Sequence, residues 1–221
     1  MRTRGQVFIG LLWLLALAVL LTISLAWVFY PIAIEQFELT SVVALSRQEL
    51  MDNFNQLMTY LLHPLKQELF MADFPVSASG AKHFADVKHL FLLAEAVFIG
   101  LAYPAVRFFF QAMRDRELIF YRQIFLGAML FSVLIAGLGM VVGFETFFTL
   151  FHTLLFPGDS SWLFNPTTDP VILVLPAEFF LACFILFFLI YQALVGMLLL
   201  LSYRQSASDS LENRFCFIQA D

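Results

Sequence analysis

Four long apolar stretches constrain the fold of this chain more than any other feature of its sequence. Each has about the 20 apolar residues that a helix needs to cross a bilayer core, and they cover residues 7–30, 90–110, 124–144 and 171–201. The chain is 61% hydrophobic and 13% charged, whereas soluble domains have about 25% charged residues. We predict an all-α membrane protein with four transmembrane helices in one membrane domain, residues 1–203, followed by a tail of residues 204–221.

The distribution of arginine predicts the orientation of these helices. Cytoplasmic loops carry an excess of Lys and Arg, and eight arginines fall on one side of the predicted bundle: Arg2, Arg4, Arg107, Arg114, Arg116, Arg122, Arg204 and Arg214. The segment 145–170 has no Lys or Arg, and segment 31–88 is rich in acidic residues. Both termini and the tail are therefore expected in the cytoplasm, and segments 31–88 and 145–170 outside the cell.

Both outer segments contain patterns that predict local structure. Ser46 and Glu49 have the spacing of a capping box, and apolar residues at helical spacing follow, so a helix is expected from Ser46 to about Pro64. Residues 77–80, with the sequence Ser-Ala-Ser-Gly, are typical of a turn. Residues 144–156 are apolar but too few for another span, so an interfacial or re-entrant segment is expected there.

Composition excludes several function classes. The net charge of −5 offers no basic patch for phosphates, so nucleic acid is not expected as a partner. The two cysteines, Cys183 and Cys216, lie in an apolar span and in the tail. The sequence has no Cys/His cluster of the kind that binds structural zinc. It also has no P-loop or dinucleotide-binding motif in a sequence context that would support one.

Four histidines, His63, His83, His89 and His152, lie in the predicted outer segments or at their edges. His83 and His152 lie within a few residues of span ends, at the depth of lipid ester linkages. The short loop between the second and third spans returns the chain to the same face, so these two side chains should converge. Asp86 follows His83 by three residues and could orient its imidazole, or it could simply decorate an exposed turn. A metal site of His83, Asp86 and His152 is a further alternative.

Two acidic residues, Glu95 and Glu178, lie inside predicted spans. Ionisable residues at that depth are candidates for function, although both are shallow enough for their carboxylates to reach the interface.

Two blocks of sequence resemble a known family. The first has Ser77, Gly80, His83, Phe84, Asp86, Val87, Lys88, Leu90 and Phe91, and the second has Phe151, His152, Phe156, Gly158, Asp159, Trp162, Asp169, Val171, Ile172, Pro176, Phe179 and Phe180. Together with the layout of the spans over residues 1–203, they resemble the bacterial lipoprotein intramolecular transacylase family, Lit.

The resemblance implies an acyltransferase of the bacterial cell membrane with its active site on the extracellular face. Its substrate is a diacylated lipoprotein N-terminus, whose sn-2 acyl chain moves from glycerol to the α-amino group of cysteine and gives the lyso-form. His83 and His152 are then the catalytic residues. Supporting or substrate-binding candidates are Tyr60, Asp86, Lys88, Asp159, Trp162, Asp169 and Glu178. No cofactor or metal is implied, and the partners are the lipoprotein and membrane lipid.

The chemistry agrees with two histidines as general base and acid. An α-amino group has a pKa of about 7.7 to 8.0 and needs a base before it attacks an ester. Which histidine has which role stays open at this point. A lipid or lipoprotein ester hydrolase with the same histidines, and a non-catalytic module that binds an envelope partner, are the alternatives.

The orientation is testable by cysteine accessibility. Cysteines introduced at Ser79 and Ser160 should react with a membrane-impermeant maleimide added to intact cells, because both lie in predicted outer segments. A cysteine in the basic loop of residues 111–123 should be protected until the cells are lysed. Protection of either outer position would contradict the orientation.

Overall fold

A computed structural model describes the backbone of residues 3–218 and the side chains of residues 3–206. Within these residues, four helical segments are long and apolar enough to cross a membrane. They are α1 (Arg4–Gln36), α4 (Ala78–Arg114), the combined segment of η1 (Glu117–Tyr121) and α5 (Arg122–Val142), and the part of α7 (Ala177–Ile218) up to Ser206. The predicted all-α architecture with four long apolar helices is confirmed.

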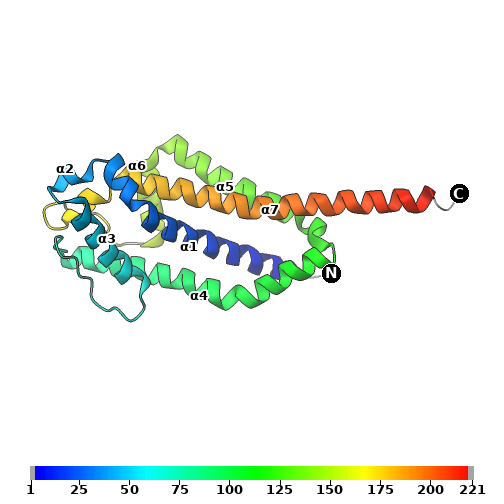
Figure 1. Cartoon of the computed structure of the whole chain (residues 1–221), viewed down its shortest axis with the longest axis horizontal. Helices are drawn as coiled ribbons and strands as arrows, with labels where there is room; N and C mark the ends of the chain where they lie inside the picture. Colours follow the sequence, from blue (N-terminus) through cyan, green and yellow to red (C-terminus); the bar gives the residue numbers. More distant parts are fainter. Residues whose placement is uncertain (1–2, 219–221) are drawn as a thin grey trace. The chain divides into compact units, whose positions relative to one another are not determined.

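Three shorter α-helices, α2 (Leu39–Val43), α3 (Arg47–Leu62) and α6 (Phe144–Leu155), gather at the end of α1 that is remote from the N-terminus (Figure 1). The capping box predicted for α3 is present, with the Glu49 amide donating to Ser46 Oγ and the Ser46 amide donating to Glu49 Oε2 at 2.8 Å. The apolar face of α3 is buried as its spacing predicts, through Leu50, Phe54, Leu57, Met58 and Leu61.

The turn predicted at residues 77–80 is wrong, because α4 begins at Ala78. Ser77 acts as its N-cap: its hydroxyl accepts a hydrogen bond from the Gly80 amide at 3.0 Å, and its carbonyl accepts from the Ala81 amide at 2.8 Å. Small polar residues favour turns and helix starts for the same reason, since their side chains bind nearby backbone amides. Consequently α4 carries residues 78–89 as helix before the apolar span begins.

The fourth apolar stretch also begins differently from the prediction. Residues Pro170–Val174 form a short 3₁₀ helix, η2, and α7 starts only at Ala177. The backbone of Leu175 is not helical (φ −124°, ψ 65°), because Pro176 disfavours the α conformation for the residue before it. The helix predicted from residue 171 is therefore interrupted before Ala177.

The described chain forms two compact units, each with its own core. The first unit contains residues 3–18, 97–138 and 188–218, and its core includes Val7, Phe108, Tyr121, Phe125 and Val195. The second unit contains residues 19–96 and 139–187. Its core includes Tyr30, which stacks on Phe54 of α3 at a ring-centroid distance of 3.7 Å and donates to the Val174 carbonyl at 2.9 Å. The hydroxyl of Tyr30 thus joins α1 to η2.

Some predicted positions lie beyond the described residues. They are Arg2, residues 219–221 of the tail, and the side chains of residues 207–218, which include those of Arg214 and Cys216.

Candidate functional site: a buried histidine pair

His83 lies in the second turn of α4, and its position is fixed by the way α4 begins. The Asp169 carboxylate, 3% exposed, accepts a hydrogen bond from the Ser77 amide at 2.7 Å and another from the Thr168 hydroxyl at 2.7 Å. A carboxylate is stabilised at the amino end of a helix, where unpaired amides and the helix dipole are positive. Burial raises the pKa of Asp169, but the hydrogen bonds from Thr168 and Ser77 together outweigh it and keep the pKa below its usual value. Asp169 therefore joins the loop before η2 to the start of α4.

Gly80 is the residue that allows this contact. A Cβ atom at position 80 would lie closer to Asp169 Oδ1 than van der Waals contact allows, and 3.0 Å from a ring carbon of Phe164. Neither neighbour is free to move, because the carboxylate is hydrogen-bonded and Phe164 packs on Phe84 and His83. A side chain at position 80 would thus push the loop away from α4.

His152 lies in the last turn of α6. This helix is separate from α5 because Gly143, with φ +83°, adopts a conformation that L-residues rarely reach and breaks the helix. The expected separate segment after the third span is therefore present as a helix of 12 residues. The Nδ1 atom of His152 lies 2.8 Å from the Phe148 carbonyl oxygen.

The two imidazoles meet, as their positions beside the second and third spans predict. The ring centroids of His83 and His152 are 5.7 Å apart, and the side chains are 6% and 7% exposed. Aromatic rings enclose the pair: His152 stacks on Trp162 at 4.8 Å, and His83 packs edge-on against Phe156 at 5.2 Å and Phe164 at 5.5 Å. The Nδ1 atom of His83 is buried and has no hydrogen-bond partner among the described residues.

The contact with Phe148 defines the tautomer of His152. A carbonyl oxygen only accepts hydrogen bonds, so Nδ1 must carry the proton, and in the neutral ring Nε2 keeps its lone pair. Burial lowers the pKa of His152, and the opposing effect of the Phe148 carbonyl is smaller. His152 is therefore neutral at physiological pH and has a basic nitrogen opposite its anchored one.

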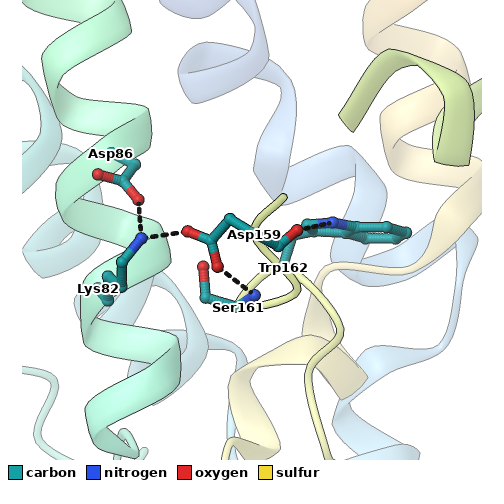
Figure 2. A network of polar contacts seen from close by, with 5 residues as sticks. All are labelled: Lys82, Asp86, Asp159, Ser161 and Trp162. Atoms are coloured by element: carbon teal, nitrogen blue, oxygen red, sulfur yellow. Dashed lines mark hydrogen bonds and ion pairs between the residues drawn. The ribbon is translucent and has the colours of Figure 1, made fainter. Parts of the chain in front are cut away.

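An ion network, shown in Figure 2, includes Lys82, the residue before His83. Lys82 Nζ donates to Asp86 Oδ2 at 2.8 Å and also binds Asp159 Oδ2. Asp159 Oδ1 accepts from the Ser161 amide at 2.9 Å, and the Asp159 carbonyl accepts from Trp162 Nε1 at 3.1 Å. The hydrogen bonds from Lys82 and from the Ser161 amide lower the pKa of Asp159 to about 2. The network thus joins α4, through Lys82, to the loop that places Trp162 on His152.

The structure corrects one suggested contact. Asp86 was expected either to orient His83 or to decorate an exposed turn, and its carboxylate pairs with Lys82 instead of with His83. The reason is geometric: Lys82 and Asp86 are four residues apart on one helical face, where such pairs meet.

Other candidates lie apart from the pair. Lys88 is buried and donates to the His63 carbonyl at 2.9 Å and to the Lys66 carbonyl, while its ammonium lies 4.4 Å from the centre of the Tyr60 ring. Lys88 and Tyr60 thus hold the chain after α3 against α4. Glu178 is exposed in the first turn of α7.

Sequence reasoning missed the structural use of Ser77 and Gly80, the ion-pairing of Lys82, and the packing of Phe148 and Phe164 on the histidines. Ser77 and Gly80 stood in the resembling block, but their helix-capping role was hidden by a turn-like composition. Among residues 3–206, no three His, Cys, Asp or Glu side chains form a group that could hold a metal ion.

The fold and this site define a class: a helical membrane protein with a buried pair of imidazoles enclosed by aromatic rings. A family model described as "Lipoprotein intramolecular transacylase Lit" matches residues 5–180, so the chain belongs to this family of acyltransferases.

Solved structures show the same fold. The chain is similar to the membrane-integral lipoprotein intramolecular transacylase Lit from Bacillus cereus, with 23% identity, a TM-score of 0.81, and 92% of this chain and 94% of that chain covered. Variants of that protein with one histidine replaced by arginine or by alanine match with 22% identity and a TM-score of 0.75. The match to the arginine variant covers 94% of this chain and 92% of the variant. The match to the alanine variant covers 93% of this chain and 94% of the variant. No curated protein matched the chain.

The contact between Gly80 and Asp169 gives a testable prediction. Gly80→Ala should lower the thermal midpoint in detergent, because the new methyl group meets Asp169 Oδ1 and Phe164. In an Asp169→Ser background, the same change should reduce the stability less. The interaction free energy between the two substitutions should be about 0.5 to 3 kcal/mol, as for residues in contact. Gly100→Ala is the control, since a Cβ there meets nothing within 4 Å. Strict additivity of the two changes would contradict the contact.

Proposed function

We propose that this transacylase moves the sn-2 acyl chain of a diacylated lipoprotein from glycerol to the cysteine α-amino group, using His83 and His152. The observation that carries the proposal is the meeting of two buried imidazoles, with centroids 5.7 Å apart, inside an aromatic enclosure. We also propose, from the arginine distribution, that this site faces the outside of the cell.

His152 is the general base in this proposal. Its Nδ1–H is anchored on the Phe148 carbonyl, so the lone pair of Nε2 accepts the proton that the amine loses as its nitrogen attacks the ester carbonyl carbon. The new C–N bond and the old C–O bond coexist in a tetrahedral intermediate. When the C–O bond breaks, the same proton passes from His152 to the leaving glycerol oxygen. An amide and a free hydroxyl result, and no water is consumed.

His83 stabilises the intermediate. Its Nδ1 has no hydrogen-bond partner within the part of the chain that the structure describes, so the ring can bind the substrate, and its N–H donates a hydrogen bond to the oxyanion. A donor that is already in place costs no reorganisation during the reaction, and removal of one such donor typically reduces the rate by about 10² to 10³.

The enclosure favours transfer over hydrolysis. Trp162, Phe156 and Phe164 cover the imidazoles and leave little access for water as a competing nucleophile. Because ester and amine belong to one molecule, the protein has only to hold them together, and such proximity contributes up to about 7 to 11 kcal/mol. This argument favours the transacylase over an ester hydrolase with the same histidines.

The reaction is tested with purified protein and a diacylated lipopeptide. Mass spectrometry should find an isomer of unchanged mass, with fragmentation placing one acyl group on the amine. His83→Ala and His152→Ala should each lower turnover by at least about 10², and the double variant should be little worse than the worse single one. His63→Ala, an exposed histidine outside the pair, is the control. Loss of one acyl chain as free acid would contradict transfer.

The pH dependence tests the role of His152 separately. The acceptor amine must lose its proton, so log kcat should rise with a slope of one below about pH 8. Burial lowers the pKa of His152, so the base stays neutral as pH falls, and the slope should become two only below the ordinary histidine value of about 6.5.

Trp162→Ala provides the comparison. The indole covers one face of the His152 ring, so its removal admits water. The pH at which the slope of log kcat changes from one to two should therefore rise towards 6.5. An unmoved profile would contradict burial as the cause.

A further inference from the structure

A cavity of about 590 Å³ lies beside the histidines in the second unit. Its walls come from one face of α4, with Lys82, Asp86 and His89, and from the end of α6 and the following loop, with Leu155, Phe156 and Asp159. Phe156 also packs on both imidazoles, at centroid distances of 5.2 Å from His83 and 6.0 Å from His152. The cavity and the histidine pair therefore share a wall.

The polar wall of the cavity carries a net negative charge. Lys82 is the one Lys or Arg among the described residues that line it, and its ammonium binds the two carboxylates of Asp86 and Asp159. One positive charge against two negative ones leaves one negative charge, with His89 as the remaining titratable group of the wall. The carboxylate side chains are only 32% and 23% exposed, so solvent screens them less than fully exposed groups.

The network is already matched to a primary ammonium group. Lys82 Nζ is such a group, and it binds both carboxylates at once (Figure 2). The side chain of Lys82 is 57% exposed, so it has room to turn outward when another cation enters. In addition, Ser161, a residue that is 6% exposed, has its hydroxyl beside the Asp159 carboxylate (Figure 2), where it contributes to the lowered pKa of Asp159. The oxygen of this hydroxyl keeps a lone pair that can accept a hydrogen bond from an added N–H donor.

We propose that this cavity is the subsite for the protonated α-amino terminus of the lipoprotein, which Asp159 and Asp86 bind in competition with the Lys82 ammonium. The inference rests on the proposed function and adds to it a specificity site for a free amine. Lys82 directly precedes His83 in sequence, and Trp162, bonded to the Asp159 carbonyl, stacks on His152. A terminus bound here thus lies next to both histidines before it loses its proton.

The charge pattern argues against an anionic ligand. A phosphate headgroup in the cavity would meet a lysine that is already bonded to two carboxylates, and like charges in partly desolvated surroundings repel. The lining of the cavity suits an amphipathic ligand, since Leu155 and Leu90 line it together with the charged residues. A lipidated amino terminus combines both properties.

The test uses unreactive ligands, so that binding is measured without turnover. Two dialkyl ether lipopeptides, which have no ester to transfer, differ only in a free or an acetylated α-amino group. Binding to the full-length protein in detergent is measured at pH 6.5, where a free α-amino group is charged. The wild-type protein should bind the free amine about tenfold more tightly, as expected for a hydrogen-bonded charge pair.

Variants then assign that preference to the network. Asp159→Asn should reduce the ratio of the affinities for the free-amine and the acetylated ligand to about one. Binding of the acetylated ligand itself should stay unchanged. Lys82→Met should increase the ratio, because the competing ammonium is gone. Glu35→Gln, an exposed carboxylate that pairs with Arg47 in the same unit, is the matched control and should change nothing. If Asp159→Asn fails to fold, Asp86→Asn and Lys82→Met still decide the question.

Equal binding of both ligands by the wild-type protein, or a preference that survives Asp159→Asn, would overturn this subsite. Failure of the proposed transfer reaction is a separate result: it would appear as an unchanged ester lipopeptide, while the preference for a free amine persists. In that case the cavity would still bind amino termini, and the reaction at the histidines would be a different one.

Discussion

The bond between the Asp169 carboxylate and the amino end of α4 is the contact on which the histidine site depends. It joins the loop that follows α6 to the helix that carries His83. The carboxylate can approach the helix this closely because residue 80 is a glycine, and a Cβ atom there would collide with Asp169. Helix starts attract carboxylates because their first amides lack partners. The same loop places Trp162 on His152. One buried carboxylate thus positions the aromatic cover of one histidine relative to the helix of the other.

The aromatic enclosure determines what kind of chemistry the pair can perform. Burial disfavours a charged imidazole, and the rings of Trp162, Phe148 and Phe156 provide the apolar surroundings of His152. Its polar anchor, the Phe148 carbonyl, comes from the preceding turn of the same helix. The tautomer and the basicity of His152 are therefore set by α6 and the loop that follows it.

Local patterns predicted the spans, the capping box of α3 and the convergence of His83 with His152, because periodicity, charge and helix order determine these features. The start of α4 and the gap before α7 were not predictable in the same way. Ser77 favours a turn and a helix start equally, and only the tertiary contact with Asp169 is specific to the helix. The partner of Asp86 was equally open, since both His83 and Lys82 lie within reach of it on α4. Distances between segments far apart in sequence decide such choices, and local patterns do not contain them.

The pairing of Asp86 with Lys82 has a chemical consequence for the site as a whole. A carboxylate bonded to an imidazole raises its pKa and favours the protonated ring, which would disable a base whose substrate is itself protonated. Phe156 lines the cavity together with the carboxylates, which are bonded to an ammonium, and it also packs on the imidazoles, which lie among aromatic rings. In the proposed function, attraction for a charged amine and removal of its proton thus belong to neighbouring environments of opposite character. An amine that crosses from the first to the second becomes easier to deprotonate, because desolvation disfavours its charged form as well.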